Sequence, residues 1–358
     1  MNRIIATMRN DSGISPLKTV LGLLALTGLF IFPSFVQSPY ALHIMILLFL
    51  ATIQGEAWNI IGGYTGQYSV GHAAYFGAGA YTTMILLQYK QIPPWYGMLA
   101  GIMVALVVSL IIGSICFRLR GPYFVLASIA VAEIMRLCAM NLKELTNGAE
   151  GILITELPPL KLGETVVTDF LTKVPFYYIA LAIAIITILT TWLVQNSKLG
   201  YCFQAIREDQ DAANSLGINL SFYKNSALAI SAVFTSLAGS FYGAYIGFID
   251  PPTVLALDIS VQIVLICIIG GIGTIWGPVV GALVLVPLSE ALRSNLIAQA
   301  IFKTGLASEE SGTGIFLKEH LAHAHALIYG ILVVVVILFM PDGVLGWVKK
   351  MSSGKGRG

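Results

Sequence analysis

The sequence predicts an all-α integral membrane protein, a polytopic bundle of about ten transmembrane helices with cytoplasmic N- and C-termini. Three observations lead to this fold class. Of the 358 residues 57% are hydrophobic and only 11% are charged, whereas a soluble domain carries roughly 25% charged residues. The apolar residues form runs of about 20, the length at which a helix crosses a bilayer. The basic residues gather in alternate connecting segments, as the positive-inside rule requires.

The apolar runs must be helices, because an open sheet edge would leave backbone groups unpaired in lipid and because the runs are too long for barrel strands. We expect spans at residues 19–36, 41–61, 66–88, 95–117, 122–141, 174–195, 223–248, 254–272, 276–294 and 322–340. They define a transmembrane domain over residues 19–348, between a cytoplasmic tail of residues 1–18 and a basic tail of residues 349–358.

The first run also has the basic flank of a signal peptide, but no clean A-x-A cleavage site follows it, so we interpret it as a retained span. With the N-terminus inside, most external basic residues fall in two long loops, residues 142–173 and 295–321, which the positive-inside rule weights weakly. Both loops are polar. They are expected to be connectors, with a docking surface for an external protein as the alternative.

Residues 197–219 are too polar to span a membrane and too patterned for a plain linker. Their apolar residues recur at spacings of three, seven and three. This spacing predicts that the following residues share one helical face: Phe203, Ile206, Ala213 and Leu216. Gly217 is a helix stop. We expect a short amphipathic cytoplasmic helix over residues 200–217. Its polar face is acidic, which disfavours anionic lipid and favours a partner's groove.

This segment resembles the cytoplasmic coupling loop of ABC importer permeases, most closely the branched-chain amino-acid permeases of the LivM type. Other stretches share the likeness: GGYTGQYSVGHAAYFGAGAY at 62–81, RLRGPYFVLASIAVAEIMRL at 118–137, LTNGAEGI at 145–152, GFIDPPT at 247–253, IIGGIGTIWGPVVGA at 268–282 and IYGILVVVVILFMPDGVLG at 328–346. The likeness covers most of residues 40–350. The first forty residues and the loop near 303–320 depart from it.

The resemblance implies one permease half of an importer in the bacterial inner membrane. Its partners would be a homologous second permease subunit, two cytoplasmic ATP-binding subunits and a periplasmic substrate-binding protein. The substrate would be a branched-chain or related amino acid, with another small polar solute such as urea as the alternative. The implied ATPase-coupling residues are Gly200, Ala205, Ile206, Arg207, Glu208, Asp209, Ala212, Ala213, Leu216 and Gly217.

Two glycine-rich stretches, residues 62–81 and 270–281, lie at bilayer depth. Each is either a broken helix lining a substrate path or a tightly packed helix with a small-residue face. Glu133 and Arg136, three residues apart, form either a structural ion pair or a contact for a zwitterionic substrate. The candidate path residues are Gly66, Gln67, Ser69, Gly71, His72, Glu133, Arg136, Gly270, Gly271 and Gly273.

Two further patterns have less functional weight. Gly239, Gly243 and Gly247 form a GxxxGxxxG ridge, which packs helices together either within the chain or against a partner. A histidine cluster follows Glu319, and no further ligand at helical spacing completes a metal site there. We therefore predict an interfacial cluster, not a metal centre, for His320, His323 and His325.

The sequence lacks the common motifs of nucleotide-binding and catalytic sites. The sequence contains no G-x-x-x-x-G-K-[ST], HExxH or GxSxG, and no basic nucleic-acid patch. We predict a chain that is not an enzyme, binds no cofactor, and depends on partner subunits that use ATP. The alternative is a stand-alone secondary transporter, whose ion-binding acids would be Glu133, Glu56 and Asp258.

Overall fold

The computed structural model describes most of the chain, and the described part is mostly helical. The described residues are 16–293, except Gln37, Glu156, Pro159, Gly163, Glu164, Asp169 and Leu171, together with Gly330, Val334, Leu338 and residues 343–353. The expected span at 322–340 lies almost entirely outside them. The expected loop at 295–321 and the histidine cluster lie entirely outside them.

The chain divides into two compact units, Met1–His43 and Ile44–Gly358. The described part of the first unit holds α2 (Pro16–Phe35) and the first residues of α3 (Pro39–Trp58). Both helices are 20-residue apolar segments without an acidic residue in the first turn, as expected of membrane-spanning helices.

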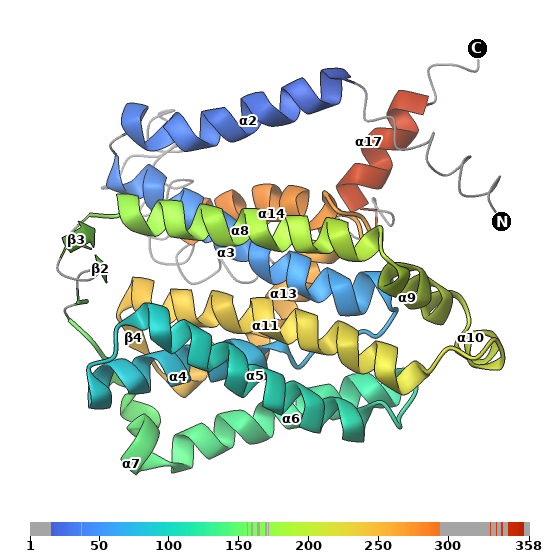
Figure 1. The fold of residues 1–358 in the computed structure, drawn as a ribbon, viewed down its shortest axis with the longest axis horizontal. Coiled ribbons are helices and arrows are strands. Elements are labelled where there is room, and N and C mark those ends of the chain that lie inside the picture. Colours follow the sequence, from blue (N-terminus) through green and yellow to red (C-terminus); the bar gives the residue numbers. More distant parts are fainter. Residues whose placement is uncertain are drawn as a thin grey trace, which may run out of the picture. The chain divides into compact units, whose positions relative to one another are not determined.

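The core of the second unit is a close-packed set of three helices, α4 (His72–Lys90), α5 (Pro94–Cys116) and α11 (Leu220–Ile246) (Figure 1). Glycines let their backbones touch. A Cβ added at Gly239 would lie 1.9 Å from the carbonyl oxygen of Phe76, and one at Gly79 would lie 2.2 Å from that of Ser236. The Gly239 ridge therefore packs within the chain, although Gly247 caps α11 and is not part of the helix.

The remaining elements surround this core. They are the π-helix η1 (Asn59–Tyr64), α6 (Pro122–Asn141), α7 (Lys143–Thr146), the 3-10 helix η2 (Gly148–Glu150), α8 (Val174–Gln195), α9 (Lys198–Glu208), α10 (Gln210–Ser215), α12 (Pro251–Val254), α13 (Leu257–Gly270), α14 (Gly277–Arg293) and α17 (Gly343–Ser353). The last two helices pack on α13 and on each other.

Four short strands interrupt the all-α pattern. β1 (Ile152–Leu153) pairs antiparallel with β4 (Phe248–Ile249), and β2 (Leu160–Leu162) pairs antiparallel with β3 (Thr165–Thr168). The loop expected over residues 142–173 is therefore partly structured, and β1–β4 pairing ties it to the end of α11. These strands lie at the end of the second unit opposite α9 and α10 (Figure 1).

Six described helices are long and apolar enough to cross a membrane: Pro39–Tyr64, Pro94–Cys116, Pro122–Asn141, Val174–Gln195, Leu220–Ile246 and Pro251–Gly270. Each overlaps a span expected from the sequence. The expected span at 66–88 differs, because its first residues are irregular and the helix begins only at His72. The described residues therefore support a multi-pass helical membrane protein, and the number ten stays a prediction.

Candidate functional site

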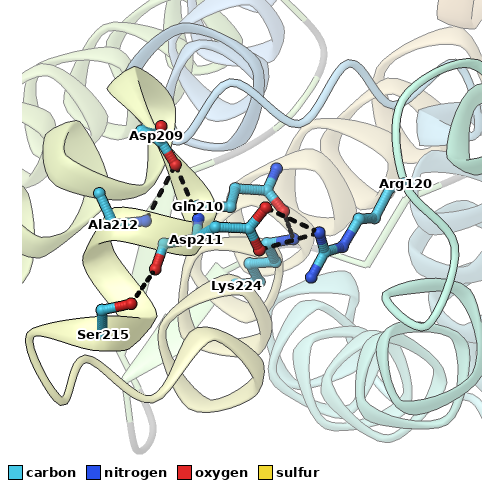
Figure 2. Close-up of polar contacts among 7 residues, drawn as sticks. All are labelled: Arg120, Asp209, Gln210, Asp211, Ala212, Ser215 and Lys224. Carbon is cyan, nitrogen blue, oxygen red and sulfur yellow. Dashed lines mark hydrogen bonds and ion pairs between the residues drawn. The ribbon is translucent and has the colours of Figure 1, made fainter.

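The polar segment forms two helices, α9 and α10, and not the single helix expected over residues 200–217. Asp209 lies between them with an extended backbone. Its carboxylate accepts hydrogen bonds from the backbone N–H groups of Asp211 and Ala212, at 2.8 and 2.9 Å (Figure 2). This is the bonding of a helix N-cap, where Asp is a preferred residue. We call residues 198–217 the coupling segment.

The apolar face of the coupling segment points into its own chain. Phe203, Ile206 and Ala213 are buried, and Phe203 joins the core cluster that includes residues of η1. Leu216 is 83% exposed. The expectation that all four residues insert into a partner's groove is therefore wrong for three of them, because α8 and α11 hold the segment against the bundle.

Arg207 connects the coupling segment to both glycine-rich stretches. Its guanidinium Nη1 donates a hydrogen bond to the carbonyl oxygen of Gly63, at 2.7 Å. A Cβ added at Gly66 would lie 3.2 Å from Arg207 Cγ, and one at Gly273 would lie 2.5 Å from Arg207 Nη1. A side chain at Gly273 would force the Arg207 guanidinium to shift, one at Gly66 would crowd the aliphatic part of Arg207, and both positions have a positive φ that favours glycine.

The first glycine-rich stretch is a broken helix. The α-helix α3 passes into the buried π-helix η1, and no regular helix follows until His72. We call residues 59–71 the first break. Gly66 has φ +69°, and the indole Nε1 of Trp58 donates to the carbonyl oxygen of Ser69, at 2.7 Å. Side chains thus replace the missing helical hydrogen bonds, as irregular backbone at membrane depth requires.

The other predicted path residues of this region are buried among polar groups. His72 Nε2 lies 2.8 Å from the Ser231 hydroxyl on α11. Gln67 is 4% exposed. A Cβ added at Gly71 would lie 2.4 Å from the carbonyl oxygen of Ser128 on α6, so the first break packs directly on that helix.

The second glycine-rich stretch is also interrupted. Residues 271–276, between α13 and α14, are not helical, and we call them the second break. Gly271 and Gly273 have φ of +125° and +75°, conformations that favour glycine. Asn59 joins the two breaks: its Nδ2 donates to the carbonyl oxygen of Thr274 at 2.9 Å, and its Oδ1 accepts from the N–H of Gly273 at 2.8 Å.

Glu133 and Arg136 pair with each other on α6, with Nη2 and Oε1 2.5 Å apart. The Arg136 side chain is 25% exposed and the Glu133 side chain 45%. In the described part of the chain no hydrogen bond or ion pair joins them to either break. The structure therefore brings the glycine, Gln67, Ser69 and His72 candidates together and leaves this pair apart.

Polar contacts join α10 to two other elements (Figure 2). Arg120, in the loop before α6, pairs with Asp211 at 3.0 Å, and Lys224 of α11 donates to Gln210 Oε1 at 2.7 Å. Because Arg120 and Asp211 are both mostly exposed, their pair is worth at most about 1 kcal/mol.

The remaining coupling candidates divide by exposure. A Cβ added at Gly200 would lie 2.3 Å from the carbonyl oxygen of Val194, so the turn from α8 into α9 requires a small residue. Ala205 is partly buried. The exposed members are Arg207, Glu208, Asp209, Ala212, Leu216 and Gly217, next to Tyr201, which is 57% exposed.

A small cavity borders the first break. It is lined by Ser69 and Gly71 together with residues of α4, α5, α6 and α11, and its free space is about the size of one water molecule. The first break is therefore closed around little free space, and a solute could pass only if the surrounding elements moved.

Asn59 is a residue of the site that the sequence analysis did not identify. It lies three positions after Glu56, which is completely buried near the Thr191 hydroxyl of α8. A polar side chain inside an apolar run was the available signal. Its partners lie more than 200 positions away along the chain, so the sequence could not identify them.

A family profile described as the branched-chain amino acid transport system permease component matches residues 40–337. The chain belongs to this family. The match begins at the start of α3 and includes both breaks and the coupling segment. The protein is thus a permease subunit of an ABC importer, as the resemblance implied.

The permease is similar to proteins named LivM and LivH. It is 28% identical to the high-affinity branched-chain amino acid transport system permease protein LivM of Escherichia coli strain K12, over 78% of this chain and 70% of the relative. It is 24% identical to LivH of the same strain, over 81% and 89% of the two chains. A shorter likeness, 30% over 28% of this chain and 30% of the relative, links it to the autoinducer 2 import permease LsrC of Yersinia pseudotuberculosis strain IP 31758.

Proposed function

We propose that this permease carries branched-chain or related amino acids across the bacterial inner membrane, driven by separate ATPase subunits that bind the exposed side of the coupling segment. The observation that carries the proposal is the position of α9 and α10. They are water-soluble in character, lie together at one end of the bundle, and are fixed to membrane helices by buried residues (Figure 1).

The docking side differs from the one expected from periodicity. It consists of the exposed Leu216 and Tyr201 with the acidic Glu208. An exposed leucine and tyrosine beside charges make the mixed apolar and polar surface typical of a protein interface. The apolar face of α9 is buried against the bundle, so a movement of α9 caused by a partner on this outer side would be transmitted directly to the bundle.

The rest of the assembly follows from the same family. We propose that α9 and α10 face the cytoplasm with both termini, that about ten spans are present, and that a homologous second permease completes the path. A periplasmic binding protein would dock at the opposite end, where the β1–β4 pair lies. The LivM and LivH relatives support a second permease of this kind.

The substrate proposal rests on the names of the relatives. The name of LsrC gives autoinducer 2, which is not an amino acid, as its transported solute. Another small polar solute, such as urea, therefore stays the alternative substrate. For the alternative of a stand-alone secondary transporter, the pairing of the Glu133 carboxylate with Arg136 disfavours Glu133 as the ion-binding acid.

The proposal is tested by replacing the most exposed coupling residue. Leu216→Asp should leave the permease folded and inserted, because this side chain is 83% exposed, and should reduce the amount of ATPase subunit that co-purifies with it. Leu153→Asp is the matched control for co-purification only, since Leu153 is a 65% exposed leucine in β1 at the end away from the coupling segment. Full co-purification and normal uptake by Leu216→Asp would contradict the assignment.

A further inference from the structure

Arg207 lies where three parts of the permease meet. Its backbone belongs to α9, its Nη1 donates to the Gly63 carbonyl of the first break, and its guanidinium occupies the space beside Gly273 of the second break. Part of the residue stays exposed at the bundle end. No other residue of the coupling segment has a described hydrogen bond to either break.

The Gly63 carbonyl needs such a partner. The last carbonyl groups of a helix have no N–H donor within that helix, and leaving a buried carbonyl without a hydrogen bond is costly. Thr65 Oγ1 donates a hydrogen bond to the Ile60 carbonyl, and the Gln67 N–H donates to the Ile61 carbonyl. Arg207 donates to the Gly63 carbonyl in the same way. A charged donor makes this a strong hydrogen bond.

The contact reaches both breaks, not one. Asn59, in the first break, is hydrogen-bonded to Gly273 and Thr274 in the second. A displacement of the Arg207 guanidinium would therefore act on Gly63 directly, and on the second break through both Gly273 and Asn59. Both breaks are non-α-helical backbone between helices, and the hinges of conformational changes are usually loop or element-terminal residues of this kind.

We propose that Arg207 is a positioning residue that transmits movement of the coupling segment to the two breaks, and so opens the closed region around them. The proposal rests on the proposed function, since it needs an ATPase to move α9. It differs from the sequence-based role of Arg207 as an ATPase contact: the guanidinium holds this chain's own backbone, and the ATPase is bound by the outer side.

The test uses the full importer in proteoliposomes with Arg207→Gln, Arg207→Lys and the control Arg118→Gln, which removes an exposed arginine from the loop after α5. Arg207→Gln should keep co-purification and basal ATP hydrolysis, while substrate uptake per ATP falls by about 10-fold or more, the loss expected for one charge-assisted hydrogen bond. Arg207→Lys retains a cationic donor and should recover part of the uptake. Arg118→Gln should change none of the three readouts.

The outcomes separate the two proposals. If Arg207→Gln loses the ATPase subunits as Leu216→Asp does, Arg207 belongs to the docking surface and the inference is overturned, while the proposed function stands. Normal uptake per ATP by Arg207→Gln also overturns it. If Leu216→Asp keeps both ATPase subunits and uptake, the proposed function itself fails.

A measurement on the unaltered chain covers the case in which Arg207→Gln does not fold. Hydrogen exchange of residues 59–71 and 271–276 is compared in the full complex with and without a non-hydrolysable ATP analogue. The inference expects exchange in both breaks to change together on nucleotide binding. Unchanged exchange in either break would overturn it.

Discussion

At the scale of single residues, glycine decides how closely the helices approach. Gly239 lies against the Phe76 carbonyl, and Gly270 lies so close to Gly277 that an added Cβ would be 1.8 Å from the Gly277 carbonyl oxygen. Small residues of this kind let membrane helices pack without a hydrophobic driving force. The sequence showed the glycine spacing, and the structure showed that the Gly239 ridge faces α4 of the same chain.

Replacing one of these glycines should therefore destabilise the permease. Gly239→Ala places a methyl group 1.9 Å from a backbone oxygen that cannot rotate away, and overpacking costs about 1–3 kcal/mol. We expect a lower midpoint of thermal unfolding in detergent. The control is Gly28→Ala in α2, where no atom lies within 4 Å of the added Cβ. Equal midpoints for the two variants would refute the packing argument.

At the scale of elements, the coupling segment shows why periodicity alone was insufficient. A spacing of three, seven and three fits one continuous helix, and it correctly grouped Phe203, Ile206 and Ala213 on one buried face. It missed the helix end at Glu208, because the Asp209 side chain competes for backbone N–H groups and starts a new helix. Leu216 consequently lies outside the buried face.

The Asp209 cap is open to a direct test. Asp209→Ala removes both accepted hydrogen bonds and should cost α10 about 1 kcal/mol, loosening the exposed end of the coupling segment. We expect less ATPase subunit to co-purify with this variant. Asp209→Asn keeps an accepting oxygen and should behave like the unaltered permease. A loss of equal size in both variants would show that charge, and not capping, matters.

At the scale of the whole molecule, the two ends of the second unit have different characters. One end has the coupling segment with Arg120, and the other has the paired strands and the polar loop after α6 (Figure 1). In an importer these ends face different compartments. From the positive-inside rule we predict that the coupling end faces the cytoplasm.

Cysteine labelling checks this orientation. Ser215→Cys and Glu144→Cys place exposed thiols at opposite ends, in a background where Cys138 and Cys202 are replaced by serine. A membrane-impermeant maleimide should label Glu144→Cys in cells whose outer membrane alone is permeabilised. It should label Ser215→Cys only after the inner membrane is opened. The reverse pattern would remove the coupling segment from the cytoplasm and contradict the ATPase role.

Composition and apolar run length by themselves determined that this protein is a multi-pass helical membrane protein, because lipid admits only hydrogen-bonded helices of about 20 residues at this degree of hydrophobicity. The motifs along residues 40–350 determined its family. Only the tertiary structure decided what Arg207 and Asn59 do. Their partners are 144 to 215 positions distant along the chain, and such contacts form only when separate helices pack together.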